Sequence, residues 1–368
     1  MDVATPSCEL ERLFPQYHIA PLDKRLLEQA QKRLDSLTKP PGSLGRLEEL
    51  AQRLYAMRGQ MPLSVSPALM LTVAADHGIA AQRVSPFSQA VTRQMVMNFL
   101  QGGAAVNALC TCGGMDLRVV DAGCCGGPLK AHPMLLGRRL GNGTADMSKG
   151  PAMSRETCLE ALRIGIELAH DAARQGYACL GVGEMGIANT TVAAALYCSL
   201  LGLDPQDMAG PGAGAGPEMM LHKAAVIKTA MAANARALTS SDPLAILAAV
   251  GGFEIAVMCG ILLGAGIERL PVLVDGFICG AAYAAALAFA PQLAEYAILA
   301  HVSAEPGHIR AMARLGQEPL LHLGLCLGEG TGAVLAWQLL RGAAACFNDM
   351  ATFAAAGVNA ETVHRIEL

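Results

Sequence analysis

Hydrophobic positions near the N-terminus recur at helical spacing. Apolar residues follow three- and four-residue steps over residues 26–37 and again over residues 44–54. Pro40 and Pro41 lie between the two runs, and a proline ring cannot continue a helix from the preceding turn. The pattern therefore predicts a helical hairpin, with Ser43 capping its second helix.

From about residue 66 the pattern changes to short, continuously apolar runs, each followed by a polar or glycine-rich turn and then a helical stretch. The five runs are residues 68–74, 117–120, 178–182, 272–274 and 297–300. Strands of a parallel sheet are buried on both faces and are therefore continuously apolar. We expect an α/β fold in which these runs are the strands of a mainly parallel sheet.

The last stretch, residues 332–368, is alanine-rich and has helical spacing, so we expect it to pack near the N-terminal hairpin. Ligands of such parallel sheets bind beyond the carboxyl ends of the strands, so the turns that follow the strands are the place to look for chemistry.

Composition narrows the classes of function. The chain is 53% hydrophobic, carries a formal net charge of −4 and has no lysine or arginine cluster, which argues against nucleic acid as a partner. The uncharged run that comes nearest to a membrane span, residues 276–294, is dominated by alanine and glycine and contains Pro291, so we expect no membrane span. Residues 1–6 lack a basic segment followed by an apolar one, so we expect no signal peptide and a cytoplasmic location.

Neither a cofactor nor a metal is expected. Most of the twelve cysteines lie singly in apolar runs, and the pairs at 110/112 and 124/125 lack the two-residue gap of a zinc site. His301, Glu305 and His308 suggest metal ligands, but the Pro-Gly pair at 306–307 interrupts a common helical register.

The segment Asp76-His77-Gly78 allows two interpretations. One is a catalytic dyad or a pair of metal ligands. The other is a strand-end aspartate that caps the next turn, beside a histidine hydrogen-bonded to backbone, and it is at least as well supported.

Two glycine-rich segments suggest an anion site. Between a predicted strand and helix, Gly183 and Gly186 let the backbone approach a ligand, and Asn189, Thr190 and Thr191 suit a helix start. A second glycine run, residues 210–216, precedes Lys223, which would supply a point charge to a phosphate. The alternatives are an ordinary capped turn and a flexible surface loop.

Glu329 differs from the other acidic residues because glycines flank it within the apolar stretch 320–340. Apolar surroundings raise the pKa of a carboxyl group toward the range that proton transfer needs. The alternative is a solvated turn residue. Glu184, also flanked by glycine at a strand end, is the second candidate carboxylate.

Residues 85–89 and the helical run after them offer hydroxyls and an aromatic face that suit a planar ligand. The alternative is an exposed loop and a helix cap.

Taken in order, six segments resemble the nicotinate-nucleotide:dimethylbenzimidazole phosphoribosyltransferase family. They are residues 39–48, 75–78, 181–191, 251–253, 274–277 and 327–330, and the similarity extends from about residue 20 to residue 355. The resemblance implies a large α/β catalytic domain, residues 66–332, with a doubly wound, mainly parallel sheet and helices on both faces. With it come a small helical domain, made of residues 1–65 and 333–368, and a homodimer that requires no metal. The resemblance further implies transfer of phosphoribose from nicotinate mononucleotide to 5,6-dimethylbenzimidazole.

The resemblance also assigns roles. It implies that Glu329 is the base and that Glu184 lies close to the base or the ribose. The donor phosphate and ribose would be held by Gly183, Gly186, Asn189, Thr190, Thr191 and Lys223, and the acceptor by Ser85, Phe87, Met95 and Leu327. At position 87 this chain has phenylalanine where some members of the family have a small polar residue. The resemblance therefore determines the acceptor less closely than it determines the type of reaction.

Two other functions are compatible with this fold class. A dinucleotide-dependent oxidoreductase needs a phosphate fingerprint after its first strand, and residues 74–78 are not one. A non-catalytic protein that binds nucleotides or benzimidazoles would have no use for a base at position 329.

Overall fold

In residues 8–359, which the computed structural model describes, six parallel strands form one sheet. They are β1 (Ala68–Ala75), β2 (Asp116–Gly123), β3 (Leu135–Gly137), β4 (Cys179–Met185), β5 (Val272–Val274) and β6 (Ala297–Leu299). Their order is β3-β2-β1-β4-β5-β6. The predicted α/β fold with a doubly wound parallel sheet is confirmed.

The strand order reverses between β1 and β4. Thr72 of β1 pairs with Val119 of β2 on one side and with Gly183 of β4 on the other. The chain winds outward from this point in both directions, and the crevice beyond the carboxyl ends of such strands is where ligands bind. The topology alone therefore locates the site near the ends of β1 and β4.

All five predicted strands are present, but the sequence did not reveal β3. This strand has only three residues, at the sheet edge, and none of them is fully buried. The strands β5 and β6 also have three residues, but they are fully buried, and their continuously apolar runs revealed them.

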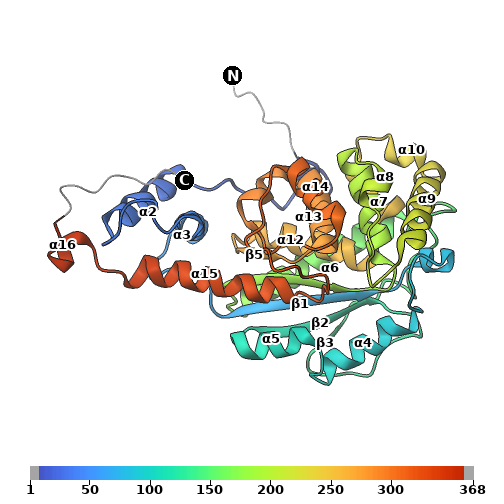
Figure 1. Cartoon of the computed structure of the whole chain (residues 1–368), viewed down its shortest axis with the longest axis horizontal. Coiled ribbons are helices and arrows are strands. Elements are labelled where there is room, and N and C mark those ends of the chain that lie inside the picture. The colour runs from blue at the N-terminus through green and yellow to red at the C-terminus, as the bar shows by residue number, and fades with distance from the viewer. Residues whose placement is uncertain (1–7, 360–368) are drawn as a thin grey trace.

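Helices cover both faces of the sheet (Figure 1). One face is covered by α6 (Arg155–Arg174), α12 (Phe253–Ile267) and α13 (Phe277–Phe289), and the other by α4 (Ala90–Leu100), α5 (Ala105–Gly113) and α15 (Thr331–Asp349). Further helices are η1 (Gly78–Gln82), α7 (Asn189–Leu201), α8 (Pro205–Met208), α9 (Pro217–Ala233), α10 (Ala235–Leu238), α11 (Pro243–Val250), η2 (Pro291–Glu295) and α14 (Pro306–Leu315).

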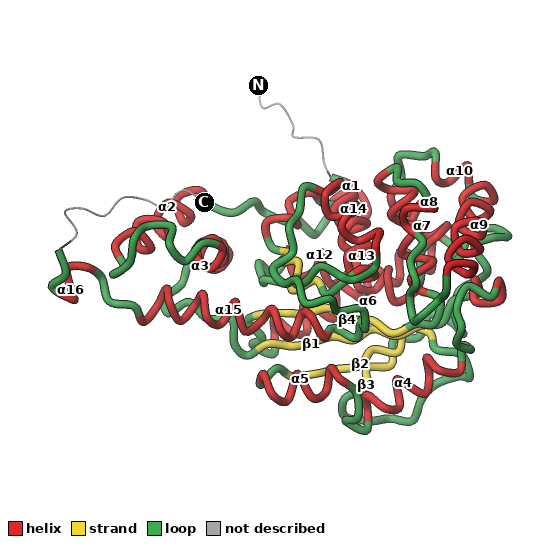
Figure 2. Tube along the Cα trace, in the orientation of Figure 1, coloured by secondary structure: helices red, strands yellow, loops and turns green. Residues whose placement is uncertain are grey.

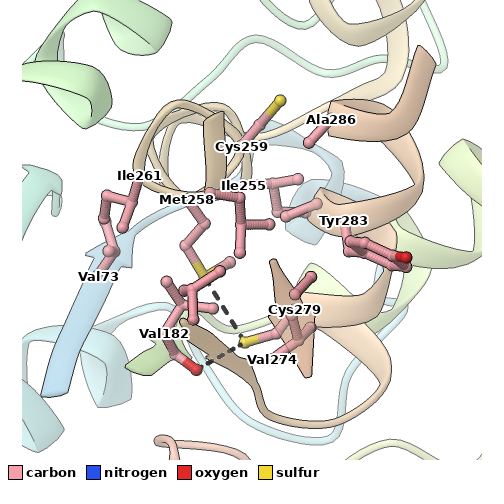
Figure 3. Packing of buried hydrophobic residues seen from close by; sticks show 14 of the residues in the cluster. Val73, Val182, Ile255, Met258, Cys259, Ile261, Val274, Cys279, Tyr283 and Ala286 are labelled. Carbon is pink, nitrogen blue, oxygen red and sulfur yellow. Dashed lines mark hydrogen bonds between the residues drawn. The ribbon is translucent and has the colours of Figure 1, made fainter. Parts of the chain in front are cut away.

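The core between α12, α13 and the sheet is built from small and branched side chains. Figure 3 shows Ile255 and Met258 of α12 facing the strands, beside Cys279 of α13. The Cys279 thiol donates to the Val182 carbonyl oxygen at 3.4 Å and lies 3.6 Å from the Met258 sulfur. Such thiols behave as small hydrophobes, as the sequence indicated.

The predicted hairpin consists of α2 (Lys24–Ser36) and α3 (Arg46–Arg58), after the short helix α1 (Glu9–Leu13). Ser43 does not cap α3, because the helix begins after Gly45, whose backbone lies at φ 53°. The loop is held instead by the buried carboxylate of Glu48, which accepts from the backbone N–H groups of Gly42 and Leu44 and pairs with Lys39 at 2.7 Å.

The C-terminal helix α15 runs from the sheet to the hairpin, as Figure 2 shows, and is followed by α16 (Phe353–Ala356). The Arg33 guanidinium of α2 donates to the carbonyl oxygens of Phe347 and Asn348 at 2.7 and 3.0 Å. The division into two domains stays a prediction, since residue 333 lies inside the continuous α15.

Residues 1–7 and 360–368 lie outside the described part of the chain, and with them the segment on which the expected lack of a signal peptide rests. Among the helices of residues 8–359, none has the length and apolar character needed to cross a membrane.

The closest helix packing yields a stability prediction. A Cβ at Gly165 of α6 would lie 2.1 Å from the Val257 carbonyl oxygen of α12, so Gly165→Ala has to push two backbones apart. We expect a loss of about 1–3 kcal/mol in unfolding free energy, measured by urea denaturation. Gly342→Ala on α15, where nothing lies within 4 Å of the added carbon, is the control and should gain up to about 1 kcal/mol. Equal effects at the two sites would contradict this account of the packing.

Candidate active site

A cavity of about 410 Å³ opens at the carboxyl ends of β4, β5 and β6. The turn after β4, the start of α13, the segment after β6 and the loop before α15 form its walls, and α4 closes one side. Eight residues predicted from the sequence line it: Phe87, Met95, Glu184, Gly186, Asn189, Thr190, Leu327 and Glu329. The fold thus brings residues 240 positions apart into one site.

Ser85 and Lys223 line a smaller adjoining cavity of about 50 Å³, which shares Gly186, Asn189 and Thr190 with the larger one. The buried ammonium group of Lys223 donates to the Thr190 hydroxyl at 3.1 Å and to the Gly210 carbonyl oxygen at 2.7 Å. Burial lowers the pKa of Lys223, while the nearby Glu305 carboxylate acts to raise it. A bound anion here would favour the charged lysine.

Gly183 and Thr191 do not line either cavity. Gly183 lies in the middle of β4, where a Cβ would be 2.2 Å from the Glu329 carbonyl oxygen. Thr191 is fully buried inside α7. The glycine is needed for the close approach of a neighbouring loop, not for contact with a ligand.

Glu329 is the most strongly constrained residue of the cavity. Its backbone lies in the left-handed region at φ 65°, which side-chain-bearing residues rarely adopt. The Thr72 hydroxyl of β1 donates to the Glu329 carbonyl oxygen at 2.8 Å, and the Val106 backbone N–H of α5 donates to its carboxylate at 3.3 Å. Strain of this kind persists only where the surroundings over-determine it, and it is common at functional sites.

Both glutamates have raised pKa values. Burial raises the pKa of Glu329, and the negative charge of Asp275 adds to this, although the Val106 hydrogen bond acts in the opposite direction. Burial raises the pKa of Glu184 to about 8, opposed by a hydrogen bond from Asn189 and supported by the charges of Glu254, Asp275 and Glu329. Near pH 7 the site therefore holds carboxyl groups poised to exchange protons.

The start of α7 differs from the prediction. Its first residue is Asn189, and the preceding Ala188 is left-handed at φ 77°, with no side-chain cap. The Asn189 side-chain amide donates to the Glu184 carboxylate instead of capping the helix. Asn189 therefore orients a buried acid, which local sequence could not reveal.

Four polar residues of the cavity were not predicted as site residues: Asp275, His301, Ser303 and Glu305. Each lies at or just beyond the carboxyl end of β5 or β6, so their strand-end positions were the available signal. The oxygens of Asp275 accept from the backbone N–H groups of Gly330 and Ala333 at 3.2 and 2.9 Å. Strand β5 thus helps to hold the loop that carries Glu329.

The second glycine run is held at the site by one of its residues, although Ala213, Gly214 and Gly216 are exposed. Its Gly212 N–H donates to the Glu305 carboxylate at 2.6 Å, and Gly212 lines both cavities. Glu305 therefore connects the loop to the end of β6.

The expected backbone partner of His77 is replaced by a carboxylate. The His77 imidazole and the Glu254 carboxylate of α12 are both fully buried and lie 2.8 Å apart. Asp76 accepts from the Cys125 backbone N–H at 2.7 Å, as a strand-end aspartate can. Neither Asp76 nor His77 lines the main cavity.

The three residues weighed as metal ligands face different protein groups. His308 accepts from the Ser303 backbone N–H at 2.8 Å, His301 lies 3.6 Å from Asp275, and Glu305 binds Gly212. Within residues 8–359, no group of three histidine, cysteine, aspartate or glutamate side chains is arranged to hold a metal ion.

One wall of the cavity is apolar. Met95 of α4 lies in it, with Phe87 and Leu327 at 48% and 57% exposure. An apolar wall that faces convergent polar groups is typical of a pocket for a small organic ligand. The parallel sheet and the position of this pocket define a doubly wound α/β protein whose site is built for acid–base chemistry on a small molecule.

Comparisons with known proteins agree. The profile of a phosphoribosyltransferase family matches residues 19–358. Over 342 residues the chain is 55% identical to the nicotinate-nucleotide–dimethylbenzimidazole phosphoribosyltransferase of Nitratidesulfovibrio vulgaris, covering 93% of this chain and 96% of that one. The enzyme of the same name from Chlorobaculum tepidum is 46% identical over 341 residues, with the same shares covered.

A solved structure is similar throughout its length. The crystal structure of the enzyme of that name from Thermus thermophilus has a TM-score of 0.86 and 43% identity, covering 92% of this chain and 99% of that one. The chain belongs to the nicotinate-nucleotide–dimethylbenzimidazole phosphoribosyltransferase family, and the resemblance seen in the sequence is confirmed.

The raised pKa of Glu184 predicts a pH-dependent stability. The folded protein binds this proton more tightly than the unfolded chain, so the contribution of Glu184 is fully present below pH 4.5 and is lost as the pH rises toward 8. Glu184→Gln has no carboxyl group to ionise and so does not suffer this loss. The difference in unfolding free energy between Glu184→Gln and wild type should therefore favour the variant by on the order of a few kcal/mol more at pH 8 than at pH 5.

Urea denaturation of both proteins at the two pH values measures this difference. The exposed Glu28→Gln on α2 is the control and should show no comparable change. A constant difference between Glu184→Gln and wild type at both pH values would rule out the raised pKa.

Proposed function

We propose that this protein transfers the 5-phosphoribosyl group of nicotinate mononucleotide to 5,6-dimethylbenzimidazole. The products are α-ribazole 5′-phosphate, a building block of the cobalamin lower ligand, and nicotinate. The observation that carries the proposal is the carboxylate of Glu329, buried in the cavity wall with a raised pKa. The names of the relatives favour this function over that of a non-catalytic binding protein.

The reaction exchanges one C–N bond for another. A ring nitrogen lone pair of the benzimidazole forms the new bond to the ribose anomeric carbon. The bond to the pyridinium nitrogen breaks, and its electron pair returns to the ring, which leaves as nicotinate. Because the departing ring is already cationic, it needs no proton. The remaining step moves the N–H proton of the new benzimidazolium to Glu329.

The raised pKa of Glu329 suits this step. A carboxylate with an ordinary pKa holds a proton too weakly to be an efficient acceptor near neutral pH, and burial corrects this. Glu184, in the same cavity, is the alternative base. Its pKa of about 8 leaves it mostly protonated near pH 7, which favours a role as a hydrogen-bond donor to the ribose or base.

The smaller cavity suits the donor phosphate. It combines the ammonium group of Lys223, the Thr190 hydroxyl and Ser85 with the first residues of α7, whose helix dipole favours an anion. In this arrangement the ribose lies between the phosphate and the carboxylates of the main cavity. Gly186 and Asn189, shared by both cavities, would face the sugar, with Gly183 and Thr191 supporting them from behind.

The apolar wall suits the planar acceptor. Phe87, Met95 and Leu327 provide a surface for a dimethylated ring, and Leu327 is two residues from the proposed base. Holding two reactants in alignment supplies roughly 7–11 kcal/mol of a barrier in ideal cases, so the reaction as written uses no cofactor.

A homodimer in the cytoplasm is part of the proposal. Phe87 and Leu327 at the cavity mouth are large apolar side chains with about half their surface exposed, which suits contact with a second copy. All twelve cysteines lie within residues 8–359 and are free thiols, as in a reducing compartment.

An assay of nicotinate release tests the reaction. Wild type should release nicotinate from nicotinate mononucleotide only when dimethylbenzimidazole is present. Glu329→Gln keeps the shape of the side chain but cannot accept the proton, so we expect kcat to fall by roughly 10²- to 10⁴-fold. Absence of turnover in the wild type would refute the transferase function and favour a binding protein.

Glu184→Gln, assayed in parallel, separates the two carboxyl groups. A full rate in Glu329→Gln together with collapse in Glu184→Gln would exchange their roles. A full rate in both would remove the need for a protein base.

Lys223→Met tests the phosphate site. Loss of the buried charge should raise KM for nicotinate mononucleotide by roughly 10- to 100-fold, the worth of one charged hydrogen bond, and leave KM for the benzimidazole within a few fold. Lys228→Met, at an exposed position on the same helix, is the matched control and should change neither KM. Equal increases in both KM values for Lys223→Met would contradict the assignment.

A further inference from the structure

We propose that Asp275, with His301 beside it, is a positioning residue that holds Glu329 in its reactive conformation. The inference rests on the proposed function. Asp275 follows β5 and His301 follows β6, so two strands of the sheet would set the position of a base carried by a third segment.

Asp275 caps α15 from outside the helix. The N-cap residue of α15 is Gly330, which has no side chain to satisfy the free N–H groups of the first turn. One oxygen of the Asp275 carboxylate accepts from the Gly330 N–H at 3.2 Å, and the other accepts from the Ala333 N–H at 2.9 Å. The first of these bonds ends on the residue that directly follows Glu329.

Glu329 is therefore fixed on both sides of its strained backbone. Thr72 donates to the Glu329 carbonyl oxygen, and Asp275 accepts from the next N–H along the chain. The peptide group between Glu329 and Gly330 is held by β1 at one end and by β5 at the other. Loss of the Asp275 contact frees one end, so φ of Glu329 can relax from 65° and its carboxylate can leave the Val106 N–H.

His301 holds Asp275 in turn. Its Nε2 lies 3.6 Å from the Asp275 carboxylate, beyond hydrogen-bond distance. Burial acts to lower the pKa of His301, but the Asp275 carboxylate and the Val302 backbone together raise that pKa above its usual value. A Cβ at Gly332 would lie 2.0 Å from the ring and one at Gly276 2.9 Å from it, so the imidazole is wedged between the starts of α15 and α13.

The charges around Glu329 come from three strands. Glu184 faces it from β4, Asp275 from the end of β5, and His301 stands beside Asp275 at the end of β6. The neighbours from β1 and α5, Thr72 and the Val106 backbone, carry no charge. A protonated His301 offsets the charge of the carboxylate that holds the base.

A double-mutant cycle tests the inference. Asp275→Asn keeps the shape but loses the charge, and it cannot accept two N–H bonds without turning its NH₂ group toward one of them. We expect kcat to fall at least about 10-fold, while KM for nicotinate mononucleotide stays within about three-fold. In the Glu329→Gln background the same change should lower the residual rate less than about three-fold, because residues that act as a unit are not additive.

His301→Gln should show a smaller loss with the same dependence on Glu329. If thermal melting shows that Asp275→Asn does not fold, the double-mutant cycle with Glu329→Gln is carried out with His301→Gln only. Asp121→Asn is the matched control, since Asp121 is also a buried aspartate at a strand end, accepts from the Gly123 and Cys124 N–H groups, and pairs with Arg139. Its kcat should stay within about two-fold of wild type in both backgrounds.

The outcomes are separable. Losses that multiply in the double mutant, or a full kcat in Asp275→Asn, overturn the inference while the transferase function stands. An inactive wild type refutes the proposed function instead. In that case, or if Glu329→Gln has no measurable residual rate, crystal structures of Asp275→Asn and His301→Gln provide the test. If Glu329 keeps its backbone conformation and its contact with the Val106 N–H in both variants, the positioning role is overturned.

Discussion

The contact between Gly183 and the backbone of Glu329 is the constraint on which the site depends. The loop before α15 lies directly on the middle of β4, so close that a single added carbon would overlap the Glu329 carbonyl group. Gly328 meets Glu184 in the same way, since a Cβ there would lie 2.2 Å from the carboxylate. A side chain at Gly183 of the strand or at Gly328 of the loop would push the loop away and separate the two acids. The sheet is therefore part of the site, not only its support.

This closeness has an energetic cost. Glu184, Asp275 and Glu329 are buried together, and each charge disfavours the others. The protein offsets part of the cost with directed donors: the Asn189 amide for Glu184, two backbone N–H groups for Asp275, and the Val106 N–H for Glu329. What is not offset remains as the raised pKa values of Glu184 and Glu329, which suit these two groups to proton exchange and destabilise the fold at alkaline pH.

The sequence predicted what depends on periodicity and on glycine placement. The five strands other than β3, the hairpin and the two candidate acids came from local patterns, and the family resemblance supplied the reaction. The sequence could not predict that the Asn189 side chain donates to Glu184 instead of capping α7, because this contact depends on the left-handed backbone of Ala188. Asp275 and His301 were visible only as strand-end polar residues. Their connection to Glu329 depends on strand order, which brings together segments that no local window contains.

Helix α15 begins two residues after Glu329 and ends beside the N-terminal hairpin, where Arg33 binds its last turn. Nineteen residues at 1.5 Å each make a rod of roughly 28 Å with no break in it. Because the helix is continuous, its far end and its first turn belong to one rigid element. The position of the loop that carries Glu329 is therefore tied to the packing of the N-terminal hairpin, although the hairpin does not line the cavity.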